Sequence, residues 1–173
     1  MSQPRPRATL AVSMTSFPSS RIVAAVSSLI SEFCRVLLDD ADLAARFHMA
    51  AQELAENLTK YSSGPLVSLR AELIGSDDSA ILRLEAKNQS SPEQLQAVER
   101  RLRELTNASD PTELYDRLIR ETAPLDNVSG LGLARIRAEG ELNVDYSIEG
   151  DELTVYVHAS IPPQGGLPHA VSE

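Results

Sequence analysis

The sequence is poor in cysteine and in long apolar runs, and each shortage excludes a class of protein. Its single cysteine, Cys34, cannot form a disulfide within the chain, so we expect it to pack as a small buried hydrophobic residue. No apolar run approaches the ~18 residues of a membrane-spanning helix. Residues 1–7 also lack the apolar segment of a signal peptide. We therefore expect a cytoplasmic protein with no membrane partner.

Positive charge is also scarce. Lysine and arginine together number 16 against 25 aspartates and glutamates, which gives a net charge of −9, and only two of the cations are lysines. An acidic chain repels nucleic-acid backbones, so we expect no nucleic-acid partner. The three histidines are scattered, without metal-ligand spacing, and no Ser-His-Asp, Cys-His or Cys-x-x-Cys arrangement is present. The sequence therefore does not support a zinc site or a nucleophilic hydrolase.

The length of 173 residues and the hydrophobic content of 42% indicate one soluble globular domain. We expect a flexible tail at residues 1–7, a domain over 8–160 and a second tail over 161–173. The apolar patterns predict an α/β two-layer sandwich, with a mixed, mostly antiparallel sheet that carries helices on one face. The strands are expected near residues 10–14, 66–74, 80–87, 142–148 and 153–157.

Two helix starts are unusually clear. Ser91-Pro92-Glu93-Gln94 and Asp110-Pro111-Thr112-Glu113 both place a capping residue before a proline, with Gln or Glu two residues after that proline. Other helices are expected after Ser19, after the acidic turn at residues 39–42, and over residues 131–138. On the two strands of the first hairpin, the polar side chains are expected to point mainly to water, which leaves the sheet covered on one side only. These are Ser68, Arg70, Glu72, Arg83 and Glu85.

One helix carries a possible site. Glu53, Asn57 and Lys60 lie at i, i+4 and i+7, so they share a stripe beside the apolar stripe of Leu54 and Leu58. A carboxylate beside a carboxamide suits water activation and Mg²⁺ coordination. The alternative is a solvated helix face, because this spacing occurs in many helices.

A glycine loop lies far downstream. Ser129-Gly130-Leu131-Gly132-Leu133 precedes a helix, and its backbone N–H groups can approach a phosphate closely. Here the chain resembles the GHKL ATPases, which include histidine kinases, gyrase-type ATPases and anti-sigma serine kinases. Glu53-Leu54-x-x-Asn57 resembles their N box, and Gly130-Leu131-Gly132-Leu133 resembles their second glycine box. The resemblance covers residues 8–160 and points to the small anti-sigma and partner-switching branch.

The resemblance implies roles for particular residues. Glu53 would be the catalytic base, Asn57 a Mg²⁺ ligand, and Gly130, Leu131, Gly132 and Leu133 would contact ATP. The family's first glycine box, D-x-G-x-G, is missing, however. Asn88 stands where its aspartate belongs, no glycine follows, and the helix cap at Ser91 comes at once. Asn can accept from the adenine amine but lacks the charge that strengthens the bond. We therefore expect a rigid element in place of the flexible nucleotide lid.

Three functions are compatible with this pattern. The first is a bacterial regulator of the anti-sigma or partner-switching type, which binds a sigma factor or an anti-anti-sigma-like protein and makes weak or no use of ATP and Mg²⁺. The second is an active ATP-dependent protein serine kinase, and the third is a sensory or scaffold module whose pocket holds another ligand. The edge strand near residues 8–15 also predicts a homodimer.

Overall fold

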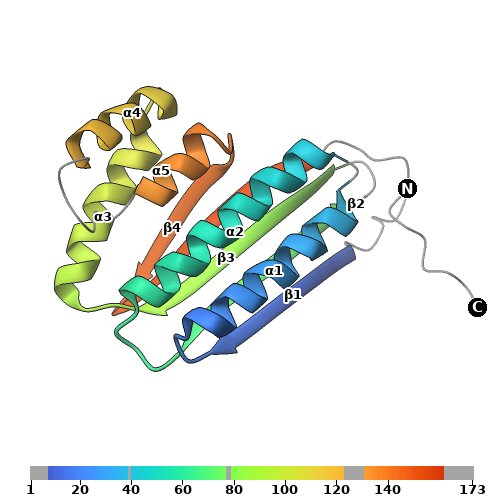
Figure 1. The fold of residues 1–173 in the computed structure, drawn as a ribbon, viewed down its shortest axis with the longest axis horizontal. Coiled ribbons are helices and arrows are strands. Elements are labelled where there is room, and N and C mark those ends of the chain that lie inside the picture. The colour runs from blue at the N-terminus through green and yellow to red at the C-terminus, as the bar shows by residue number, and fades with distance from the viewer. Residues whose placement is uncertain (1–7, 39, 77–78, 123–130, 162–173) are drawn as a thin grey trace, which may run out of the picture.

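The computed structural model describes residues 8–38, 40–76, 79–122 and 131–161 (Figure 1). They form a five-stranded sheet of order β1-β2-β3-β5-β4, and all four strand pairings are antiparallel. The α/β sandwich is confirmed. Its elements are β1 (Ala8–Ser16), α1 (Ser20–Leu37), α2 (Ala41–Tyr61), β2 (Val67–Ser76), β3 (Ser79–Gln89), α3 (Pro92–Asn107), α4 (Pro111–Thr122), α5 (Leu131–Ala138), β4 (Asn143–Glu149) and β5 (Glu152–Ile161).

Side-chain caps mark the starts of α2, α3 and α4. Asp40 Oδ1 accepts hydrogen bonds from the first backbone N–H groups of α2, and Asp110 Oδ1 does the same for α4. At α3, the Ser91 hydroxyl accepts from Gln94 N while Gln94 Oε1 accepts from Ser91 N, a complete capping box. Ser19 precedes α1 but its side chain makes no capping hydrogen bond. The rigid helix expected directly after β3 is therefore present.

Helices α1 and α2 lie side by side over one face of the sheet (Figure 1). The inner face of the sheet alternates as expected, with Leu69 and Ala71 on β2 and Leu82 and Leu84 on β3 fully buried. Phe47 of α2 is the largest fully buried side chain of the core. Cys34 is buried too, and burial raises the pKa of its thiol to about 12, so it behaves as the hydrophobic residue expected. Among the described helices, none is both long and apolar enough to cross a bilayer.

The outer face of the sheet corrects one expectation. Glu72 does not point to water, because its side chain is only 11% exposed between Arg70 and Arg83. Arg83 Nη2 donates to Glu72 Oε2 at 2.9 Å and Arg70 Nη2 donates to Oε1 at 3.2 Å. Arg83 also lies over the ring of Tyr156, with 5.6 Å between its guanidinium carbon and the ring centre. The pairing comes from β2, β3 and β5 together, so the alternation of a single strand does not reveal it.

Replacing Glu72 with glutamine is expected to lower the free energy of unfolding by about 1–2 kcal/mol at pH 7, since both arginines are more than one-third exposed and partly screened. Burial alone raises the pKa of Glu72, but the hydrogen bonds from Arg83 and Arg70 outweigh it and hold that pKa below its usual value. A lowered folded-state pKa stabilises above the unfolded pKa of about 4.3, and this contribution is lost as pH falls further.

Denaturant unfolding of the wild type and Glu72→Gln at pH 7 and at pH 3 measures this effect. The difference between the two proteins should shrink at the lower pH. Glu149→Gln, at an exposed position of β4, is the matched control and should change little at either pH. A difference that stays constant with pH would contradict the ionic role of Glu72.

Candidate functional site

The two sequence motifs that are far apart in the chain meet between α2 and α5. Glu53 and Asn57 project from the middle of α2, and Leu131 and Gly132 form the first turn of α5, which packs against α2. All four residues line one polar depression on the protein surface. The N-box pair thus shares a surface depression with Leu131 and Gly132, while Leu133 lines a different space, together with Asn57. Gly130 and the loop before it lie outside the described residues.

Gly132 allows this close approach. A Cβ atom built at Gly132 would lie 2.2 Å from Glu53 Oε2 and 3.0 Å from Glu53 Cδ. The Glu53 carboxylate therefore lies directly against the first turn of α5, where the helix dipole favours negative charge. The glycine is required for space, since its backbone φ is not positive. The space in which the resemblance places a ligand phosphate holds this carboxylate instead.

Arg135, one turn further along α5, engages Glu53. Its Nη1 donates to Glu53 Oε1 at 3.2 Å, and its Nε donates to Glu139 Oε2 at 2.7 Å. The hydrogen bond to Glu139, supported by that to Glu53, raises the pKa of Arg135, so its charge is fixed. Burial, together with the negative charge of Glu139, raises the pKa of the adjacent Tyr115 on α4. The depression thus contains a closed ion-pair network that joins α2 and α5.

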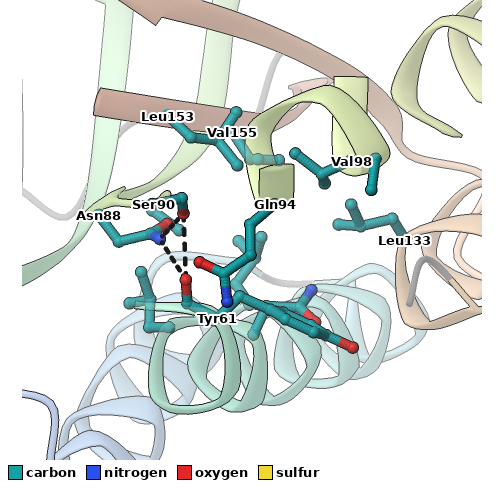
Figure 2. A pocket seen from close by; sticks show the side chains of 13 residues that line it. Tyr61, Asn88, Ser90, Gln94, Val98, Leu133, Leu153 and Val155 are labelled. Atoms are coloured by element: carbon teal, nitrogen blue, oxygen red, sulfur yellow. Dashed lines mark hydrogen bonds between the residues drawn. The ribbon is translucent and has the colours of Figure 1, made fainter. Parts of the chain in front are cut away.

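An apolar cavity of about 120 Å³ adjoins this depression (Figure 2). Asn57 and Tyr61 line both spaces, so the two are neighbours. The walls come from α2, α3, α5 and the sheet, and most of the lining side chains are aliphatic. They include Leu54, Leu58, Ala86, Val98, Leu133, Leu153 and Val155.

Asn88 lies at the polar end of the cavity, where β3 ends. It is 7% exposed, and its Nδ2 donates to Ser90 Oγ at 2.8 Å and to the Tyr61 carbonyl at 3.4 Å. Ser90 Oγ donates to the same carbonyl at 3.1 Å (Figure 2). Tyr61 is the last residue of α2, so these two side chains satisfy a carbonyl that the helix leaves unpaired. An aspartate, the residue that the GHKL pattern has here, has no proton to donate to that carbonyl.

The structure brings Glu53, Asn57, Leu131, Gly132, Leu133 and Asn88 to these two neighbouring spaces. Their roles in chemistry remain predictions. Sequence reasoning missed Arg135 and Ser90. The i, i+4 pairing of Arg135 with Glu139 marks an ion pair on α5, but only the packing of α5 on α2 joins it to Glu53.

ATP with Mg²⁺ does not fit the site as these residues are arranged. The two carboxylates nearest to Arg135 are already paired with it, and Glu53 fills the space at Gly132. Three carboxylates (Glu53, Glu56 and Glu139) against two cations (Lys60 and Arg135) leave the depression with a net charge of −1. In the described part of the chain, no group of three or more His, Cys, Asp or Glu residues is arranged to hold a metal.

The fold places the chain among α/β sandwiches whose helices cover one face of an antiparallel sheet. No protein-family model matches the chain, and no curated protein matches it by sequence. Among solved structures, it is similar to a chain in the SiaB–SiaC complex from Pseudomonas aeruginosa, with a TM-score of 0.61 and 13% sequence identity. The match covers 87% of this chain and 89% of that chain. At this identity the likeness establishes a shared fold.

Proposed function

We propose that this protein is a regulator that acts by binding another protein, with weak or no use of ATP. The observation that carries the proposal is the likeness of nearly the whole fold to a chain whose crystal structure is a two-protein complex. The ion pair of Glu53 supports the second part of the proposal, the weak or absent use of ATP, because a carboxylate paired with Arg135 is not available as a base. The partner class remains the one that the GHKL resemblance implies, a sigma factor or an anti-anti-sigma-like protein.

Helix α4 is the surface that we assign to this partner. It packs on α5 and buries Leu114 and Leu118, while Ile119 is 41% exposed. We take this exposed aliphatic side chain, set among the charged residues of α4, as the anchor of the contact. Helix α5 carries Arg135, and its first turn lies against Glu53 of α2. Because α4 packs on α5, a partner bound to α4 would lie next to the helix that forms the candidate site.

The test uses the full chain to capture proteins from its own organism, followed by purification of the captured protein and calorimetric titration. Ile119→Glu is expected to weaken that binding by about tenfold or more, because it places a charge at the centre of the contact. Ile81→Glu, the same change at an isoleucine of β3 that is also 41% exposed, is the matched control and should bind the partner normally. Equal binding by Ile119→Glu would exclude α4, and the absence of any purified partner would contradict the regulatory function.

The same purified pair tests the kinase alternative, which the convergence of Glu53, Asn57 and Gly132 favours. Incubation of partner and protein with ATP and Mg²⁺, followed by mass spectrometry, reports phosphate transfer. We expect no transfer. Phosphorylation that disappears with Glu53→Ala would establish a kinase in place of a binding regulator.

We further propose that the protein is a homodimer that uses the β1 edge and α1. Strand β1 pairs only with β2, so its outer edge has no neighbouring strand within the described sheet. Phe17, at the end of this edge, is 59% exposed, and Leu29 and Val36 on α1 are more than half exposed. A second copy that packs here would cover the unpaired strand and these side chains.

A further inference from the structure

We infer that Arg135 is the resident cation of the polar depression, and that it excludes a divalent metal ion from the place where the GHKL resemblance puts Mg²⁺. The inference goes beyond the regulatory function, since it concerns a cation and needs no protein partner. Its first basis is the contact of one guanidinium with two carboxylates. Arg135 Nη1 donates to Glu53 Oε1 at 3.2 Å, and Arg135 Nε donates to Glu139 Oε2 at 2.7 Å.

An arginine and a divalent metal ion compete for such carboxylates. A guanidinium has only donors, and it can bind two carboxylates at once through separate N–H groups. Mg²⁺ instead needs about six oxygen ligands at about 2.1 Å. The hydrogen bond to Glu139 raises the pKa of Arg135, so this side chain does not release the carboxylates by losing its proton. A metal ion would have to break two charge-assisted hydrogen bonds to reach them.

The position of Glu53 is the second basis. A Cβ atom at Gly132 would lie 2.2 Å from Glu53 Oε2, so the carboxylate uses the space that the missing side chain leaves. Its other oxygen, Oε1, accepts from Arg135. The Glu53 side chain is only 20% exposed, against 44% for Arg135. Both oxygens of Glu53 are thus in contact with α5, and neither is free to coordinate a metal ion.

The rest of the depression would suit a cation if Arg135 were absent. Glu56 lines it, and so does Asn57, whose side-chain carbonyl oxygen is a ligand type that Mg²⁺ accepts. Replacement of Arg135 by a neutral residue changes the net charge of the lining residues from −1 to −2. Lys60 is then the one cation among the described residues that line the depression. Arg135 is therefore the residue that decides whether a divalent cation is held here.

The experiment measures the binding of Mn²⁺ alone, without nucleotide, to the full chain. Electron paramagnetic resonance reports the concentration of free Mn²⁺, and NMR line broadening locates the bound ion. Arg135→Gln is expected to bind Mn²⁺ at least about tenfold more tightly than the wild type. The bound ion should broaden the amide signals of Gly132 and Asn57, which line the depression. Adding Glu53→Gln to Arg135→Gln should reverse the gain, because it removes one of the two freed carboxylates.

Two controls separate a site from general attraction to an acidic protein. Arg35→Gln breaks an exposed ion pair with Glu32 on α1, so it changes the net charge of the chain by the same amount. It should gain no Mn²⁺ binding. Arg135→Lys keeps the positive charge and should exclude Mn²⁺ as the wild type does. Arg135→Ala is the second neutral variant if Arg135→Gln does not fold.

Three results would overturn the inference. Wild-type protein that binds Mn²⁺ as tightly as Arg135→Gln would show that the arginine does not close the site. A neutral variant with no gain in Mn²⁺ binding would show that the freed carboxylates hold no cation. An equal gain in Arg35→Gln would assign the effect to overall charge. None of these results depends on whether a protein partner is found, so this inference and the regulatory function can fail separately.

Discussion

Replacing Asn88 with aspartate is expected to destabilise the protein by about 3 kcal/mol at neutral pH. The substitution restores the residue type of the GHKL pattern, yet the structure opposes it. Asn88 is buried, and its amide donates to the Tyr61 carbonyl and to Ser90 Oγ. A carboxylate cannot donate, and it would place a negative charge against the carbonyl end of α2, where the helix dipole is already negative. Denaturant unfolding of both proteins at pH 7 measures the loss.

The loss should depend on pH. Burial without a cationic partner raises the pKa of the new carboxyl above its unfolded value, so the folded state binds the proton more tightly. The destabilisation is therefore complete at neutral pH and decreases as pH falls through the raised pKa towards about 4. Asn57→Asp is the matched control, because Asn57 lines the same cavity but is partly exposed to water, and it should cost less than about 1 kcal/mol. Equal stability of Asn88→Asp and the wild type at pH 7 would show that the amide does not cap α2.

Replacing both Leu29 and Val36 with glutamate is expected to raise the dissociation constant of the proposed homodimer by about a hundredfold or more. The two residues are seven positions apart on α1, so they lie on one stripe of the helix, and they are 54% and 65% exposed. In a symmetric dimer each substitution occurs twice, which would bring four carboxylates into one apolar contact. Sedimentation velocity at tens of micromolar protein reports the change from dimer to monomer.

The control for this experiment is Ile119→Glu, which also replaces an exposed aliphatic residue but lies on α4. It should remain dimeric with the same melting temperature as the wild type. A monomeric wild type at tens of micromolar would contradict the dimer itself. A double variant that stays dimeric would place the contact away from α1.

The features that could be predicted from the sequence are those set by neighbours in the chain. The capping box at Ser91 and the cap at Asp110 involve residues two to three positions apart. The short sequence motifs around them therefore predict the starts of α3 and α4. The same holds for the spacing of Glu53 and Asn57 on one side of α2. The strands followed from alternation, since the inner and outer faces of the sheet differ in polarity.

The features that could not be predicted depend on residues brought together by packing. Glu72 is buried because arginines on two strands enclose it, and nothing in β2 alone marks it. The pairing of Glu53 with Arg135 joins residues 82 positions apart. The use of the Asn88 amide is set by where α2 ends, at Tyr61. The sequence therefore predicted where the candidate site lies, but it did not predict the hydrogen bonds and ion pairs within the site.

The strand order has a consequence for synthesis of the chain. Strand β3 is central, but one of its neighbours, β5, is synthesised later than the other four described strands. Before β5 is synthesised, β1, β2 and β3 can form a sheet in which β3 is an edge strand. Its unpaired N–H and C=O groups then lie beside the apolar residues Leu82 and Leu84. Edges of this kind recruit strands from other chains. Chains truncated before residue 152 are thus expected to aggregate, and the polar row of Arg83, Glu85 and Lys87 is the protection that β3 carries in the meantime.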